Sequence, residues 1–254
     1  MTAPGTAAGP GTPAHDGSRS LYTYFRSSAA YRVRIALGLK GLDYEAIPVH
    51  LLKDGGQQLS PAYREVNPFG LVPAYAEDGH TLTQSLAIIE YLDERYPEVP
   101  LLPGSAWERA QVRQLALAVA CEIHPINNLR VLKYLSQTLE LPETAKQQWL
   151  HHWMQSGLES LEETVVRMGQ GGDFCAGSAP TLADCCLVPQ LFNARRFGVD
   201  LTRCPRLLAI DQACAARPAF QSAHPDAQPD AAWCRGAGLG SRPVSYTHLR
   251  AHET

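Results

Sequence analysis

The residues best suited to chemistry near the start of the chain are Arg26, Ser27 and Ser28, which stand between a strand-like segment at 21–25 and a helix-like segment at 30–37. Serine is a favoured N-cap, because its oxygen accepts from the free N–H groups of the first helical turn. A helix start also carries partial positive charge and unpaired donors, which suit an anion. Two interpretations follow: an ordinary capped helix, or a site that holds a thiolate or carboxylate.

A second pair of polar residues, Gln84 and Ser85, precedes a predicted helix at residues 86–95. Ser85 can cap that helix, and its hydroxyl and amide can also receive a carboxylate. Between the two helix starts, Val72-Pro73 lies at the beginning of a predicted strand, where proline removes a ladder donor. Because only about 5–6% of X-Pro bonds are cis in folded proteins, these two residues alone favour a trans bond.

The elements that must position these residues form an α/β pattern over residues 20–100. Ala30, Val33 and Leu37 have the spacing of one apolar helix face. The sequence E-D-G-H at 77–80 predicts a hairpin turn. The predicted order is β-α-β-α-β-β-α, with further strands at 44–49 and 81–83 and a short helix at 60–66.

The second half of the chain follows the helical period after a proline-rich linker at residues 97–105. Thr181 and Asp184 form a predicted capping box, so Asp184 is interpreted as structural and not as a catalytic acid. Short connections between these helices indicate an all-α domain. The predicted helices span residues 107–121, 127–137, 145–168, 182–197 and 205–216.

Composition excludes several classes of function. The chain of 254 residues is 45% hydrophobic and 19% charged, with a net charge of −3, which favours neither nucleic acid nor an anionic membrane. No apolar run approaches the roughly 20 residues that span a bilayer, and the N-terminus lacks a signal-peptide pattern. The seven cysteines include no C-x-x-C, which is typical of reduced thiols in a cytoplasmic protein without a zinc site.

The joint at residues 27–37, S-S-A-A-Y-R-V-R-I-A-L, resembles the S-S-C-x-x-R-V-R-I-A-L motif of zeta-class glutathione transferases, the family that includes maleylacetoacetate isomerases. Alanine stands at position 29, where many members carry cysteine. The segment C-E-I-H-P-I-N-N-L-R at 121–130 resembles the C-x-I-H-P-x-N-N segment of bacterial maleylacetoacetate and maleylpyruvate isomerases. The resemblance covers residues 19–230. It implies a glutathione transferase fold, α/β plus all-α, with a thioredoxin-like domain at 19–100 and an all-helical substrate domain at 105–225.

The resemblance also implies a site with glutathione as cofactor. It implies that Ser27 and Ser28 stabilise the glutathione thiolate and that the Val72–Pro73 bond is cis. Arg26, the third predicted catalytic residue, is expected to hold the carboxylates of the substrate together with Arg130 and Arg196. Pro125 should break or kink a helix, so His124 and Asn128 either bind substrate or cap the kinked helix. The glutathione-binding residues implied are Gln58, Val72, Pro73, Gln84 and Ser85, and the substrate-binding residues implied are His124, Asn128, Arg130 and Arg196.

The activity implied is glutathione-dependent isomerisation of maleylacetoacetate to fumarylacetoacetate, in tyrosine and phenylalanine catabolism. Because glutathione supplies the sulfur, Ala29 in place of cysteine is tolerable. Three alternatives stay open: a maleylpyruvate isomerase of the gentisate pathway, a general glutathione transferase, and a non-catalytic binding protein. Related maleylpyruvate isomerases can carry arginine where this chain has Leu129, which favours maleylacetoacetate. The resemblance further implies a cytoplasmic homodimer.

The two ends of the chain are expected to stay outside the fold. Residues 1–18 are mostly glycine, proline, alanine and small polar residues, with almost no bulky apolar side chains, and cannot bury enough surface to become ordered, so they are interpreted as a disordered leader. Residues 231–254 lack a hydrophobic period and are interpreted as a disordered tail. Its last part, 244–254, reads as the translation of a transposase sequencing adaptor and is interpreted as an artefact.

Overall fold

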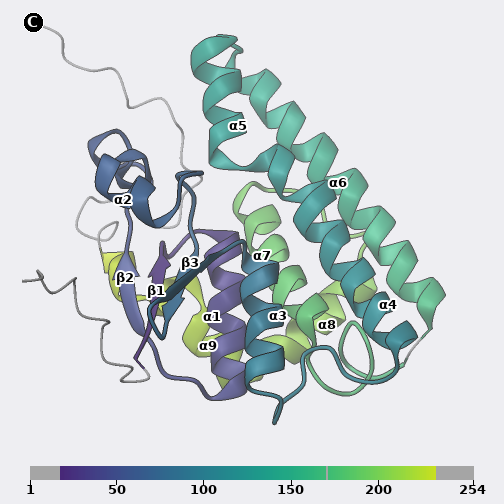
Figure 1. Cartoon of the computed structure of the whole chain (residues 1–254). Coiled ribbons are helices and arrows are strands. Elements are labelled where there is room, and N and C mark those ends of the chain that lie inside the picture. The colour runs from purple at the N-terminus through teal and green to yellow at the C-terminus, as the bar shows by residue number, and fades with distance from the viewer. Residues whose placement is uncertain (1–17, 170, 233–254) are drawn as a thin grey trace, which may run out of the picture.

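The structure, a computed structural model, describes residues 18–169 and 171–232 (Figure 1). The expected leader up to residue 17 and the tail from residue 233, with the segment 244–254, lie outside the described residues. Within the described ranges, no helix combines the length and apolar character needed to cross a membrane.

A mixed four-stranded sheet forms the N-terminal part of the fold. Its strands are β1 (Arg19–Thr23), β2 (Glu45–Pro48), β3 (Ala74–Glu77) and β4 (His80–Thr83), in the spatial order β2-β1-β3-β4. The pair β1/β2 is parallel, while β1/β3 and β3/β4 are antiparallel. Helices α1 (Ser28–Lys40), α2 (Pro61–Val66) and α3 (Ser85–Arg95) complete the predicted β-α-β-α-β-β-α order, which confirms the thioredoxin-like fold class.

The first strand lies two residues earlier than predicted, because Tyr24 and Phe25 leave the sheet and turn toward α1. Their backbone groups find side-chain partners instead of ladder partners. The guanidinium of Arg34 donates to the carbonyls of Tyr24 (3.3 Å) and Phe25 (3.0 Å). The N–H of Phe25 donates to the carboxylate of Asp230 at 2.8 Å. These bonds satisfy the backbone of the segment that leads into the first helix start.

Helix α1 is buried on nearly all sides, not on one face as its apolar spacing predicted. The side chains of Ala30, Val33 and Leu37 are inaccessible to solvent, and Arg32 and Arg34 are 2% and 1% exposed. The reason is position: α1 lies between the sheet and the C-terminal helices α7 (Leu182–Arg196) and α9 (Pro218–Ala223) (Figure 1). It ends at Gly41, whose φ of 65° is the left-handed conformation that glycine adopts most readily.

The C-terminal part is all helical, as predicted, but its middle is irregular. The predicted helix at 107–121 is α-helical as α4 (Ala106–Leu117) and continues as a π-helical segment, Ala118–Ile123. A 3-10 turn, Pro125–Asn127, follows, so the predicted helix at 127–137 begins later, as α5 (Leu129–Lys133), and then a second π-helical segment, Tyr134–Thr138. The remaining helices, α6 (Glu143–Met168) and α8 (Pro205–Ala215), are regular.

The predicted capping box at the start of α7 is confirmed. The carboxylate of Asp184, fully buried, accepts from the N–H and the hydroxyl of Thr181 at 2.7 and 2.8 Å, and from the N–H of Cys175 at 2.8 Å. Burial raises the pKa of Asp184, and these three donors oppose that rise. The carboxylate therefore anchors a loop to the central helix of the C-terminal part, and it does not line the cavity described below.

The chain finally returns to the N-terminal part. After α9, two 3-10 turns, Pro225–Ala227 and Pro229–Ala231, pass along the sheet side of the molecule. Ala231 is 6% exposed and packs with Tyr24 and Phe25, so order extends into the first residue of the range expected to be a disordered tail. This segment is ordered because Ala231 packs against Tyr24 and Phe25 and because Asp230 accepts from the N–H of Phe25. Neither interaction produces a hydrophobic period in the sequence.

Candidate functional site

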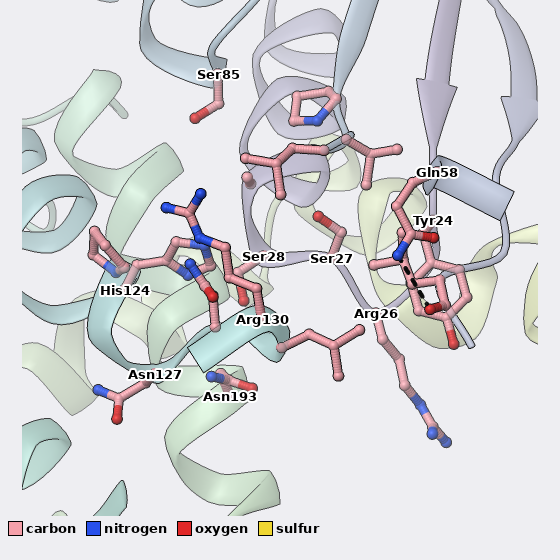
Figure 2. A pocket seen from close by; sticks show the side chains of 18 of the residues that line it. Tyr24, Arg26, Ser27, Ser28, Gln58, Ser85, His124, Asn127, Arg130 and Asn193 are labelled. Atoms are coloured by element: carbon pink, nitrogen blue, oxygen red, sulfur yellow. Dashed lines mark hydrogen bonds between the residues drawn. The ribbon is translucent and has the colours of Figure 1, made fainter. Parts of the chain in front are cut away.

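One cavity of about 530 Å³ lies between the loops above the sheet and the C-terminal helices. Figure 2 shows side chains from both parts of the chain around it. The structure brings every predicted site residue to the lining of this cavity. They are Arg26, Ser27, Ser28, Gln58, Val72, Pro73, Gln84, Ser85, His124, Asn128, Arg130 and Arg196.

The first wall of the cavity is the start of α1. The Oγ of Ser27 accepts from the N–H of Ala30 at 3.2 Å, so Ser27 is the N-cap and its hydroxyl proton stays free to donate. Ser28 is the first helical residue and is buried. In Figure 2 both hydroxyls lie in the middle of the group, whereas Arg26 extends away from them. The guanidinium of Arg26 lies 4.9 Å from the ring centre of Phe25.

The start of α3 closes the same side of the cavity. Gln84, not Ser85, is the N-cap of α3, with no side-chain cap bond and a φ of 71° that is uncommon for a residue other than glycine. The Oγ of Ser85 accepts from Nη1 of Arg32 at 3.2 Å. The Val72–Pro73 bond is cis, as the resemblance implied. Two helix starts, each with the N–H groups of its first turn, therefore converge on one cavity.

Gln58 lines the cavity from the loop after β2. Its side chain is 7% exposed, and its Nε2 donates to the carbonyl of Leu51 at 3.4 Å. Its Oε1 has no hydrogen-bond partner among the residues that the structure describes. A buried amide oxygen of this kind is costly unless something donates to it. Gln58 is thus placed to accept from a ligand that carries amide N–H groups.

The opposite wall comes from the irregular segment between α4 and α5. His124 follows the π-helical segment Ala118–Ile123 and precedes Pro125. Burial lowers the pKa of His124 to about 3, and the nearby positive charges of Arg32 and Arg130 act in the same direction. The imidazole is therefore neutral at pH 7, able to donate from one nitrogen and accept at the other, but not to act as a cation.

Of the two interpretations left open for Asn128, capping is seen directly. Its Oδ1 accepts from the N–H of Val131 at 3.2 Å and so caps α5, while the residue also lines the cavity. Arg130, the second residue of α5, is exposed and lines the cavity, and it lies on the same side as His124 in Figure 2. Arg196, in the last turn of α7, completes this wall.

Sequence reasoning missed three buried polar residues in the lining: Arg32, Asn127 and Asn193. Asn127 donates to the carbonyl of Ile123 at 2.9 Å, and its Oδ1 has no partner within the described ranges. A signal for Arg32 was available, because it is a charged residue in an otherwise apolar helix that the fold surrounds. The two asparagines carry no such signal, since asparagine is equally common in loops and caps.

The charge of the cavity is one-sided. Among the residues that the structure describes, no aspartate or glutamate lines it, whereas several cations do. The fixed dipoles of α1 and α3 add positive potential at one end. Such a cavity suits a small molecule with several negative charges, and its serine hydroxyls at a helix start suit a thiolate. The lining cations are Arg26, Arg32, Arg130, Lys133 and Arg196.

Comparisons with known proteins agree with this chemistry. The profile described as "Glutathione S-transferase, N-terminal domain" matches residues 21–100, and the corresponding C-terminal domain profile matches residues 147–220. Maleylacetoacetate isomerase of Pseudomonas aeruginosa is 49% identical over 211 residues, which span 83% of this chain and 97% of that protein.

Solved structures give the same result. A holo structure of maleylpyruvate isomerase, titled a bacterial zeta-class glutathione S-transferase, is similar with a TM-score of 0.80 and 46% identity, over 83% of this chain and 99% of the other. Maleylacetoacetate isomerase of Anaeromyxobacter dehalogenans, with glutathione bound in its active site, has a TM-score of 0.75 and 47% identity, over 84% and 98% of the two chains. This chain therefore belongs to the glutathione S-transferase family, in its zeta class.

Proposed function

We propose that this chain catalyses the glutathione-dependent cis–trans isomerisation of maleylacetoacetate to fumarylacetoacetate, in the catabolism of tyrosine and phenylalanine. The observation that carries the proposal is the cavity itself, where two helix starts and a set of unneutralised cations meet in a chain 49% identical to a maleylacetoacetate isomerase. A substrate with two carboxylates and a thiol-containing peptide would together supply the missing negative charge.

The residues present fit glutathione. The orphaned Oε1 of Gln58 is an acceptor for a peptide N–H, and Ser85 at the start of α3 is a donor for a carboxylate. Ser27 and Ser28 offer hydroxyls at the positive end of α1. Gln58 would hold the glycyl end, Val72 the cysteinyl backbone, and Gln84 with Ser85 the γ-glutamyl end.

When bound, glutathione supplies a thiolate that adds reversibly to the cis double bond, so that the carbon–carbon bond can rotate before the sulfur leaves. Ser27 would stabilise the thiolate by donating its hydroxyl proton, because its oxygen already serves as the helix cap. The positive end of α1 lowers the pKa of a thiol held there. Because glutathione supplies the sulfur, the reaction needs no protein nucleophile, and alanine at position 29 is compatible with it.

The opposite wall would hold the substrate. The guanidinium groups of Arg130 and Arg196 present paired donors that match carboxylates. His124, neutral at pH 7, can donate to an oxygen on which enolate charge develops. Arg26, which extends away from the centre of the cavity, adds positive potential at its edge and attracts the anionic substrate.

The test measures the loss of maleylacetoacetate with glutathione present and absent, together with the loss of free thiol. Glutathione-dependent turnover without net thiol loss is expected. Thiol loss equal to substrate loss would instead identify a conjugating transferase, and glutathione binding without turnover would identify a binding protein. The same mixture without the protein gives the rate of uncatalysed thiol addition, which is subtracted.

A second candidate is isomerisation of maleylpyruvate, which the similarity to a maleylpyruvate isomerase structure supports. Leu129 at the cavity lining favours maleylacetoacetate, because arginine can stand there in maleylpyruvate isomerases. The two substrates share the cis double bond conjugated to a carbonyl, so the chemistry does not separate them. The ratio of kcat/KM for the two substrates, measured on the same preparation, decides between them.

We also propose that the chain is a cytoplasmic homodimer. Leu59 and Phe69, 48% and 67% exposed, belong to the lining of the cavity together with Gly70, and their exposed apolar atoms are the ones that a second copy would cover. The described cysteines are free thiols, which agrees with a reducing compartment. Light scattering after size exclusion is expected to give twice the chain mass, and a Phe69→Glu variant is expected to shift it toward the monomer.

A further inference from the structure

Helix α1 contains two buried arginines, Arg32 and Arg34, whose hydrogen bonding differs sharply. Arg34 donates from all three guanidinium nitrogens, to the carbonyls of Ala223, Tyr24 and Phe25 and to the hydroxyl of Thr23, at 3.0–3.3 Å. Arg32 makes one bond, to the Oγ of Ser85 at 3.2 Å. Its Nε and Nη2 have no hydrogen-bond partner among the described residues.

The charge of Arg32 is also uncompensated. Its side chain is 2% exposed, and no carboxylate in the described ranges forms an ion pair with it. Burial lowers the pKa of Arg32, and the thiols of Cys186 and Cys121 oppose this only in part. The charge of Arg32 in turn helps to lower the pKa of His124. Enclosing a cation without an anion is unfavourable, and one partner hydroxyl does not offset it.

Arg32 lines the cavity, so the missing anion can come from a ligand. Its one hydrogen bond, to Ser85, links Arg32 to the γ-glutamyl end of glutathione, the end that the proposed function assigns to Ser85. The Oγ of Ser85 accepts from Arg32, and a hydroxyl has a single proton, so that proton must point away from the guanidinium. Ser85 stands at the first position of α3, where an arriving carboxylate meets the free N–H groups of the helix.

We propose that Arg32 is a positioning residue for the γ-glutamyl carboxylate of glutathione: it holds the Ser85 hydroxyl as a donor toward that carboxylate and supplies its buried counter-charge. The inference rests on the proposed use of glutathione and adds a residue to that site. It also gives a role to a second buried charge in α1, where Arg34 already makes the structural contacts.

The test compares three ligands by calorimetry: glutathione, S-methylglutathione, and a glutathione analogue that lacks the α-carboxylate of the glutamyl residue. In Arg32→Met, binding of the first two is expected to weaken about 10- to 100-fold, the range of a charge-assisted hydrogen bond. Binding of the analogue is expected to stay within about twofold. Arg32→Lys, which keeps the charge and loses the planar donors, is expected to recover part of the affinity.

Thermal unfolding without ligand separates this role from a structural one. Arg34→Met should lower Tm, because it leaves three carbonyls and a hydroxyl without their donor. Arg32→Met should keep or raise Tm, because it removes an uncompensated buried charge. Arg32→Gln offers a second variant if methionine packs poorly beside Ser85.

Equal weakening for all three ligands, with a lowered Tm, would assign Arg32 to structure and overturn the inference. Weakening confined to ligands with a free thiol would also overturn it, because the counter-charge would then serve the thiolate. A wild-type chain that binds glutathione without isomerising maleylacetoacetate would contradict the proposed reaction alone, and the ligand comparison would still decide the role of Arg32. Failure of the wild-type chain to bind glutathione would overturn both.

Discussion

The two walls of the cavity are built in different ways. The wall at the starts of α1 and α3 offers short side chains, backbone N–H groups and helix dipoles on regular elements. The opposite wall offers long cationic side chains, Arg130 and Arg196, and the first of these stands on an irregular run of π, 3-10 and short α segments. The first wall holds its hydrogen-bond donors in fixed positions, whereas the long arginine side chains of the second wall can change conformation to meet a ligand.

This difference indicates a division of work. A thiolate needs donors that are in position before the reaction, because charge on sulfur must be stabilised throughout. A dicarboxylate of variable length needs paired cations on longer side chains. Changes in the first wall should therefore lower kcat, and changes to the cations Arg130 and Arg196 of the second wall should chiefly raise KM for the carbon substrate.

The largest effect is expected from removing the Ser27 hydroxyl. Ser27→Ala should lower kcat about 10²- to 10³-fold, as removal of one preorganised donor does elsewhere. It should also cost about 1 kcal/mol of stability, because Ser27 caps α1. The measurements are steady-state turnover and urea unfolding.

Ser27→Gly is the matched control for that variant. Replacing an N-cap serine by glycine lowers the free energy of unfolding by only about a few tenths of a kcal/mol. Glycine, like alanine, lacks the hydroxyl. Turnover should therefore fall as far as in Ser27→Ala while stability recovers. If turnover in the glycine variant recovered with stability, Ser27 would be a cap only, and the first wall would lose its assigned role.

The second wall should answer differently. Arg196→Met and Arg130→Met are each expected to raise KM for maleylacetoacetate about tenfold or more, since each removes a charge-assisted contact with a carboxylate. Affinity for glutathione should change less than about twofold. Titration calorimetry with glutathione and initial rates over a range of substrate separate the two effects, and a comparable loss in both would contradict the division of work between the walls.

The sequence predicts a wall well where the interacting residues are close together in the chain, and poorly where they are far apart. The start of α1 is predictable, because a serine cap depends only on a few neighbouring residues. The end of β1 is not, because the N–H of Phe25 bonds to Asp230, 205 residues further along the chain. No local pattern at Phe25 indicates that contact.

The irregular backbone of the opposite wall is not predicted, because it depends on packing against another helix. Ile123, in the π-helical segment, lies against Gly157 of α6, where an added Cβ would come within 2.6 Å of its Cγ1. Because residue 157 of α6 has no side chain, there is room for Ile123 in the widened turn that precedes His124. The helix propensities of residues 118–123 do not depend on a glycine in another helix, so they cannot indicate the π-helical turn. The only local signal is Pro125, which predicts that the helix breaks but not that it breaks through a π-helical segment and a 3-10 turn.

A smaller effect is expected in the dependence of stability on pH. The folded pKa of His124 is about 3, against 6.5 for an ordinary histidine, so between these values the unfolded chain binds a proton that the folded chain does not. Stability should therefore fall as pH drops through this window, with about 1–2 kcal/mol attributable to His124 at pH 5.

Urea unfolding at pH 7 and pH 5 tests this. His124→Gln should lose less stability between the two pH values than the wild-type chain, and His80→Gln, at an exposed position on β4, should behave as the wild type does. Identical pH dependence in His124→Gln and the wild type would mean that His124 accepts a proton in the folded state. Its imidazolium would then join the cations of the second wall.

The smallest effect concerns the choice of substrate, and it lies entirely in the second wall. Leu129 lines the cavity next to Arg130 at the start of α5. Leu129→Arg should shift the kcat/KM ratio toward maleylpyruvate by about fivefold, a change typical of one altered contact in a pocket. Leu129→Gln, similar in length and uncharged, should leave the ratio within about twofold. Because neither change touches the first wall, glutathione affinity should be the same in both variants. A shift in that affinity would show that the two walls are coupled through α5, and that thiol binding and substrate choice are not separate properties of this cavity.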